Sequence, residues 1–146
     1  MIRLVILVGL VLAAVVLALI LQRRRPDPPS APSYRAPAQL DRDDFLRPDA
    51  AALIAVFASA TCNSCPEVWA LIEPLADRDL AVQRVDVQDG AELHRRYRID
   101  GVPTTVLADS DGVVTATFFG PVDDEALRAA VAALRAGGSG STGGHR

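Results

Sequence analysis

Several residue types that carry common protein chemistry are absent from this 146-residue chain, or nearly so. There is no lysine, because all fifteen basic residues are arginine, and this excludes covalent chemistry through a lysine amine. Only two cysteines occur, Cys62 and Cys65. Two thiols three positions apart can close a local disulfide or share a soft metal ion, but they cannot cross-link distant parts of a fold.

A structural zinc site lacks the ligands that it would need. Such sites take four ligands, usually in two pairs. Besides the two cysteines only His94 and His145 are available, and their spacing is unsuitable. We therefore expect no metal site of this kind, and nothing in the sequence calls for an organic cofactor.

Positive charge is scarce beyond the N-terminus. Four of the fifteen arginines lie among the first 25 residues, which contain no acid. The rest of the chain therefore has eleven basic residues against eighteen acidic ones, a net charge of −7. Nucleic-acid binding requires a basic surface, so we expect no nucleic-acid partner.

A long apolar run occupies the N-terminus. Residues 4–21 form 18 consecutive positions without a charge. As a helix they would span about 27 Å, close to the ~30 Å of a bilayer's hydrocarbon core. The alternative is a cleaved signal peptide, whose apolar region is about 7–15 residues long and is followed by small residues. Here Arg23, Arg24 and Arg25 follow, so we expect residues 1–25 to be a retained single-pass transmembrane anchor.

The arginines that flank this run predict its orientation. Arg3 and the α-amino group precede it, whereas three arginines follow it. The more basic flank of a membrane helix lies in the cytoplasm. We therefore expect a protein of the cell membrane with its soluble domain in the cytoplasm, where thiols are mostly reduced.

The remainder of the chain divides into three parts. Residues 26–38 are rich in proline, which is typical of an extended spacer. Residues 137–146 form a tail rich in glycine and serine, typical of a flexible segment. Residues 39–136 have the length of a single domain.

This domain alternates the patterns of strands and helices. Strands are predicted over 51–58, 80–87, 104–108 and 113–119, and helices over 66–76, 91–97 and 123–135, after a short helix over 41–46. The order is a βαβ unit followed by a ββα unit. It predicts an α/β fold with a mixed four-stranded sheet and helices on both faces.

The two cysteines stand where the first strand gives way to a helix. A Cys-x-x-Cys pair at such a junction indicates a redox site. A helix N-terminus favours the thiolate, so Cys62 is the expected attacking thiol. Cys65 continues the apolar stripe of the helix and is expected to point inward and resolve the mixed disulfide. Ser64 and Glu67 have the spacing of a capping box.

Two alternatives remain open for the cysteine pair. Two thiolates suit Cu(I), and the run from Ala60 to Cys65 looks like the loop of small copper chaperones. The pair also fits two buried, inert cysteines, because cysteine is often buried.

Four segments in a fixed order resemble the thioredoxin superfamily. They are Phe57-Ala58 before the cysteine pair, Val85-Asp86-Val87, the run from Tyr97 through Gly101-Val102-Pro103-Thr104, and Phe119-Gly120. The resemblance covers residues 41–135. It implies a thioredoxin-like fold and disulfide exchange with protein thiols and disulfides, catalysed by Cys62 and Cys65. It also implies that Pro103 is cis and faces the cysteines, and that the backbone of Val102 binds an extended substrate.

Three departures from the family pattern concern the surroundings of the cysteines. Thr61 replaces the usual tryptophan before the first cysteine, and Asn63-Ser64 replaces glycine and proline between the two. Val56 replaces a buried acid on the first strand, which in the family helps to deprotonate the resolving cysteine. These departures favour a specialised, membrane-tethered relative, or else a non-catalytic binding module or a carrier of Cu(I).

Four further residues have both a functional and a structural interpretation. Glu67 is a candidate substitute for the missing acid, and Arg84 stands where the family has a lysine that could stabilise a thiolate. Each is also typical of an ordinary exposed residue. Trp69 is predicted to pack in the core, and His94 to lie on the surface of a short helix.

Overall fold

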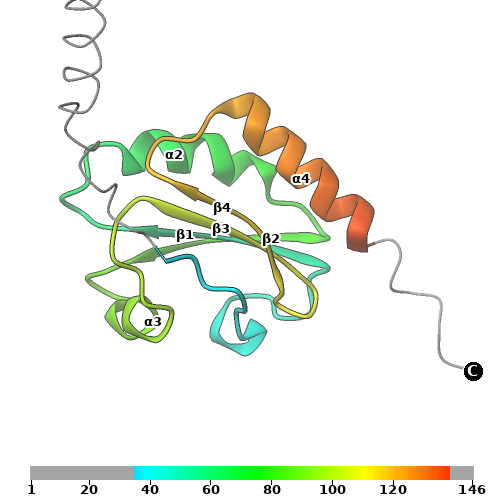
Figure 1. The fold of residues 1–146 in the computed structure, drawn as a ribbon, viewed down its shortest axis with the longest axis horizontal. Coiled ribbons are helices and arrows are strands. Elements are labelled where there is room, and N and C mark those ends of the chain that lie inside the picture. Colours follow the sequence, from blue (N-terminus) through cyan, green and yellow to red (C-terminus); the bar gives the residue numbers. More distant parts are fainter. Residues whose placement is uncertain (1–34, 139–146) are drawn as a thin grey trace, which may run out of the picture. The chain divides into compact units, whose positions relative to one another are not determined.

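The computed structural model describes residues 35–138 (Figure 1). The predicted membrane anchor and most of the proline-rich spacer and C-terminal tail lie outside the described residues. Among residues 35–138, none of the helices has the length and apolar character required to cross a membrane. The elements in chain order are η1 (Arg42–Asp44), β1 (Ala52–Ala58), α2 (Cys65–Ile72), η2 (Glu73–Leu75), β2 (Leu80–Asp86), α3 (Ala91–Arg96), β3 (Thr104–Asp109), β4 (Val114–Phe119) and α4 (Asp124–Gly138).

The four strands form a mixed sheet, as predicted, and their order in the sheet is β2-β1-β3-β4. β1 is parallel to β2 and antiparallel to β3, and β3 is antiparallel to β4. The register pairs Ala58 with Asp86 and Phe57 with Thr104. The C-terminal ends of β1, β2 and β4 therefore meet the N-terminal end of β3 at one end of the sheet.

Two predicted helices are shorter than the sequence pattern indicated. The helix expected over 66–76 ends at Ile72 and continues as the 3-10 turn η2. Pro74 lies in this turn, and proline removes a backbone N–H and crowds the preceding turn of an α-helix. The short helix expected over 41–46 is only the 3-10 turn η1.

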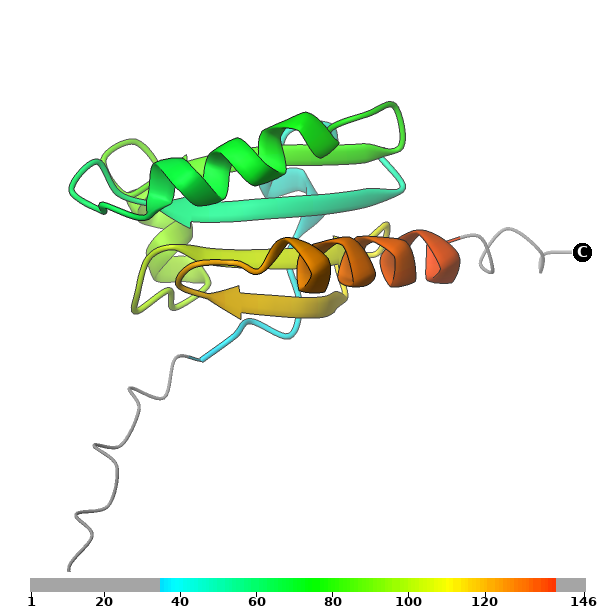
Figure 2. The same cartoon turned by 90° about the horizontal axis from the view of Figure 1, so that it is seen from above.

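β1 is the centre of two hydrophobic layers. All seven of its residues are buried. Leu53, Ala55 and Phe57 belong to the cluster beneath the sheet, whereas Ile54 and Val56 belong to the cluster above it. Figure 1 shows α2 and α4 above the sheet and α3 below it, and Figure 2 shows α2 along β1 and β2, with α4 along β3 and β4.

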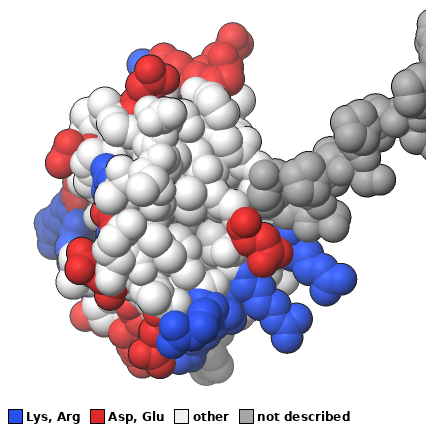
Figure 3. Space-filling model, turned by 90° about the vertical axis from the view of Figure 1, so that its left-hand side faces the viewer, with Lys and Arg blue, Asp and Glu red and all other residues white. Residues whose placement is uncertain are grey.

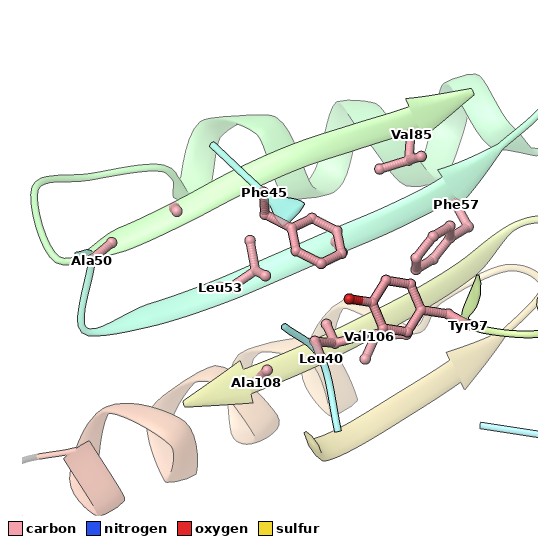
Figure 4. Close-up of a cluster of buried hydrophobic side chains, with 11 residues drawn as sticks. Leu40, Phe45, Ala50, Leu53, Phe57, Val85, Tyr97, Val106 and Ala108 are labelled. Carbon is pink, nitrogen blue, oxygen red and sulfur yellow. The ribbon is translucent and has the colours of Figure 1, made fainter. Parts of the chain in front are cut away.

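An aromatic cluster attaches the segment around η1 to the lower layer (Figure 4). The ring of Phe45 lies 6.5 Å from that of Phe57 and 5.7 Å from that of Tyr97. The Tyr97 hydroxyl donates a hydrogen bond to the Asp44 carboxylate and accepts one of 2.9 Å from the Asp41 N–H. The phenol therefore has a polar partner although the residue is buried.

The environment of Tyr97 predicts a change of stability at high pH. Burial, and then the hydrogen bond to Asp44, raise the pKa of Tyr97 to about 12, from ~10 in an unfolded chain. The folded state therefore retains the phenolic proton more firmly, and stability falls as pH rises from about 10 to about 12. The chain has two tyrosines, Tyr34 and Tyr97, so Tyr34→Phe leaves Tyr97 as the single phenol. Absorbance titration of this variant should show Tyr97 ionising near pH 12. Ionisation near the ordinary value would contradict this, and Tyr97→Phe should show less loss of stability in that pH range.

Arg42 is a buried cation, with 7% of its surface exposed. Its guanidinium donates hydrogen bonds to the carbonyls of Asp109 (2.7 Å), Ala50 (3.1 Å) and Arg47 (3.3 Å). Desolvation lowers the pKa of Arg42, and the nearby Asp109 opposes this shift. The side chain thus joins the segment after η1 to the end of β3.

Replacing this side chain should cost stability. Arg42→Met keeps the apolar stem but removes three hydrogen bonds, one of them to the buried carbonyl of Ala50, so we expect urea unfolding to show a loss of about 2–4 kcal/mol. The matched control is Arg128→Met, whose exposed guanidinium pairs with Asp124 at 3.0 Å. An ion pair in solvent contributes little, so this substitution should leave the midpoint of unfolding nearly unchanged. Equal effects of the two substitutions would contradict the role assigned to Arg42.

Candidate functional site

Cys62 and Cys65 form a disulfide, with an S–S distance of 2.06 Å and a Cα–Cα distance of 5.5 Å. Cys65 is the first residue of α2 and is fully buried. Cys62 lies in the preceding loop and is only partly buried. The two sulfur atoms are therefore bonded neighbours, and one residue is more accessible than the other.

The start of α2 differs from the predicted capping box. Ser64 is the N-cap, but its side chain makes no capping hydrogen bond, and its backbone has φ −90° and ψ −11°. An N-cap side chain accepts from the backbone N–H groups of the first turn, and this geometry typically needs an extended backbone at the N-cap residue. The Ser64 hydroxyl lies instead 3.9 Å from the Cys62 sulfur. Cys62 is two positions before the N-cap, where the helix dipole contributes less than it does inside the first turn.

A polar network holds the loop that carries Cys62. The Cys62 N–H donates to the Ser59 carbonyl at 3.1 Å. The Ser59 hydroxyl lies 3.1 Å from that of Thr61 and accepts from the Gln88 side chain at 3.4 Å. The carbonyl oxygen of the Gln88 side chain accepts from the Ala60 N–H at 3.3 Å. Sequence reasoning missed Ser59 and Gln88, because neutral polar residues 29 positions apart give no pattern.

Pro103 lies at the same end of the sheet as this loop. The Val102–Pro103 peptide is cis, as the resemblance implied. Thr104 pairs with Phe57, so Pro103 is beside the point where β1 ends and the cysteine loop begins. The Pro103 carbonyl accepts from the Gly120 N–H at 2.8 Å. Val102 makes no backbone hydrogen bond within residues 35–138 and is 36% exposed.

The surface around Val102 is apolar and slightly hollow. A cavity of about 120 Å³ is lined by Val102, Pro103 and Phe119 together with their neighbours. Val87, Val102 and Phe119 are large hydrophobic residues that remain exposed, and each lies at or beside the sheet end where β1 stops. Figure 3, which views the molecule from the left of Figure 1, shows an uncharged area across the middle of this face.

Many solved structures resemble the chain, among them the following two. A mutant form of thioredoxin from Halobacterium salinarum NRC-1 is 31% identical, with a TM-score of 0.53, over 59% of this chain and 76% of its own. The chain belongs to the thioredoxin superfamily. A malarial protein with a TM-score of 0.51 covers 57% of this chain and 96% of its own, but at 16% identity it shows the fold alone. No protein-family model and no curated protein matches the sequence.

The position of the missing family acid lies in the core of this thioredoxin-like domain. Val56 is fully buried among the residues beneath α2 and α4. Its partner in the neighbouring strand β2 is Arg84. The Arg84 guanidinium donates two hydrogen bonds to the Asp86 carboxylate, at 2.8 and 2.9 Å. These bonds raise the pKa of Arg84, and the Asp86 carboxylate balances its positive charge. Glu67 is exposed in the first turn of α2.

The burial of Trp69 agrees with the prediction, whereas the burial of His94 does not. Trp69 is partly buried against the upper cluster, as predicted. His94 is not on the surface, because only 7% of it is exposed. Its Nε2–H donates to the Val85 carbonyl at 2.9 Å, and its ring meets that of Phe57 edge-on at 5.2 Å. The two arginines that follow it, Arg95 and Arg96, indicated a solvated helix, but α3 turns the His94 side chain toward the sheet.

The network around Gln88 predicts a local effect of mutation. Gln88→Ala removes one hydrogen bond to the Ala60 N–H and one to the Ser59 hydroxyl. We expect the amides of residues 60–62 to exchange hydrogen about fivefold faster, because each bond contributes on the order of 1 kcal/mol. The measurement is hydrogen exchange of the oxidised protein.

A second glutamine, Gln83 in β2, provides the control. Gln83 accepts from the Leu46 N–H at 2.6 Å, away from the cysteine loop. Gln83→Ala should accelerate hydrogen exchange at the Leu46 amide and leave the exchange rates of residues 60–62 unchanged. If both variants, or neither, accelerate exchange at 60–62, the network does not hold the loop.

Proposed function

We propose that the chain is a thiol–disulfide oxidoreductase that exchanges disulfides with protein partners. The observation that carries this proposal is the Cys62–Cys65 disulfide, with one partly accessible and one buried residue at the sheet end that also holds Pro103. Membership of the thioredoxin superfamily supports it further. No cofactor is required, because electrons arrive from a partner dithiol.

The reaction follows from the different exposure of the two cysteines. In the reduced protein the Cys62 thiolate attacks one sulfur of a substrate disulfide, forming a mixed disulfide and releasing the other substrate sulfur as a thiolate that takes up a proton. The Cys65 thiolate then attacks the Cys62 sulfur. The Cys62–Cys65 disulfide forms, the second substrate thiol leaves, and two electrons have passed to the substrate. The same steps in reverse oxidise a dithiol.

The substrate is proposed to lie against Val102 and Pro103. The Val102 backbone has no hydrogen-bond partner within the described residues, so its groups are available to an added strand. Exposed Val87 and Phe119 supply apolar contacts on either side. Recognition would then depend on an extended backbone and apolar side chains rather than on charge.

Proton transfer to and from Cys65 needs a group other than the family's buried acid. Glu67 is two residues along α2 and reaches solvent. Positions i and i+2 of a helix do not face each other, so this carboxylate could exchange protons with the buried Cys65 only through solvent. Arg84 is assigned a weaker influence on the thiolate, because Asp86 already neutralises it.

We propose further that residues 1–25 hold the domain at the cell membrane. The support is the charge-free run 4–21 and the three arginines after it. By the positive-inside rule the domain faces the cytoplasm. The proline-rich spacer would hold the domain away from the bilayer.

Replacing each cysteine separately tests the exchange reaction. Cys62→Ser removes the attacking thiol and should lower reduction of insulin disulfides, coupled to dithiothreitol, to the dithiothreitol background. Cys65→Ser retains the attacking thiol but cannot resolve, so it should accumulate a mixed disulfide visible by mass. The matched control is Ser64→Ala, which leaves both thiols in place.

Two outcomes would contradict this proposal. One is turnover by Cys62→Ser at the rate of the parent protein. The other is absence of turnover in the parent together with tight Cu(I) binding by the reduced pair, which would favour the dithiol metal carrier.

A further inference from the structure

A cluster of arginines that form no ion pair with the other described residues surrounds a hollow next to α3. The hollow has a volume of about 530 Å³, and Arg35, Arg95 and Arg98 line it together with Val87 and Ile99. A second hollow of about 470 Å³ shares Arg35 and Arg98. In Figure 3, blue side chains gather at the lower edge of the face, beside its uncharged centre.

The three guanidinium groups have no internal function that would account for their position. All three residues are exposed, and none of their side chains makes a hydrogen bond or ion pair within residues 35–138. Arg96, in the same helix, differs because it pairs with Asp41 at 2.9 Å and Asp44 at 3.0 Å. Asp100 is the single acid in the lining of the larger hollow. Like charges placed together in an acidic chain indicate an anionic partner.

The place of this cluster in the chain favours a lipid surface as that partner. Nine residues separate Arg35 from Arg25, which ends the proposed anchor. Even fully extended, the ten steps between them span only about 35 Å. The cluster is therefore confined near the bilayer, and such tethering raises the effective concentration of headgroups. Guanidinium groups bind phosphate through paired hydrogen bonds.

We propose that Arg35, Arg95 and Arg98 form a surface that docks on anionic phospholipid headgroups of the membrane that holds the anchor. This inference rests on the anchor proposed above. Val87 lines the same hollow, and its N–H donates to the Ala58 carbonyl at 2.9 Å, next to the cysteine loop. Docking therefore brings the redox end of the domain to the membrane surface, where it meets disulfides of membrane-proximal segments.

Hydrogen exchange of the full chain in lipid nanodiscs tests this surface. Two disc compositions are compared, phosphatidylcholine alone and phosphatidylcholine with about one-third phosphatidylglycerol. We expect the amides of residues 91–99 to exchange about fivefold more slowly in the anionic discs. High salt should abolish the difference, because surface charges are screened beyond ~3 Å at 1 M.

Matched variants assign the effect to the cluster. The double substitution Arg95→Gln and Arg98→Gln should abolish the difference between the two lipids, whereas Arg128→Gln on α4 should retain it. The salt comparison uses the parent chain and does not depend on whether the double variant folds.

Two results would overturn the proposal in distinguishable ways. Co-elution with both kinds of disc, with equal exchange at 91–99, overturns docking and leaves the anchor intact. Failure to co-elute with either disc overturns the anchor and the docking that rests on it, while insulin reduction still reports separately on the exchange reaction.

Discussion

The pairing of β1 along both of its edges is the constraint on which the site depends. β1 is buried along its whole length and is hydrogen-bonded to parallel β2 and antiparallel β3. With both neighbours in register, the loop after Ala58 must leave the sheet between the end of β2 and the beginning of β3. Gln88 and Pro103 occupy those two positions. The pairing of one strand therefore places the cysteine loop, Gln88 and Pro103 at the same end of the sheet, although these residues are far apart in sequence.

The two faces of β1 also explain how this domain differs from the family pattern. Val56 extends the apolar layer beneath α2 and α4, which avoids the cost of burying a carboxylate without a partner. The core at this position gains apolar contacts and loses an internal proton acceptor. Polar groups have instead gathered outside the core, where Ser59, Thr61 and Gln88 bond to one another around the loop. Their partners are hydroxyls and amides, so this network positions the loop without adding a charge near the thiols.

The sequence was sufficient to predict the sheet, the major helices and the cysteine pair, because periodicity and short motifs report on local structure. Contacts between distant segments were not predictable in this way. His94 was placed on the surface because arginines follow it, yet α3 packs it against Phe57 and the Val85 carbonyl. The capping box was wrong because the backbone of Ser64 is already helical. Gln88 gave no signal at all, since its function depends on the end of β2 lying beside the cysteine loop.

The charges on the face that carries the cysteines are distributed unevenly, with arginines at its edge and an uncharged centre. The face with the cysteines has an uncharged centre (Figure 3), so the proposed substrate would be selected by its backbone and apolar side chains, and salt should affect its binding little. The arginines lie at the edge of that face, and a contact made by them would be sensitive to salt. The two proposed contacts would use different polar groups and share only the side chain of Val87, which also lines the arginine hollow. The proposed oxidoreductase would therefore gain selectivity chiefly from being held near one class of partner, and the proposed anchor, with its short spacer and the basic edge of the domain, would provide such a restriction.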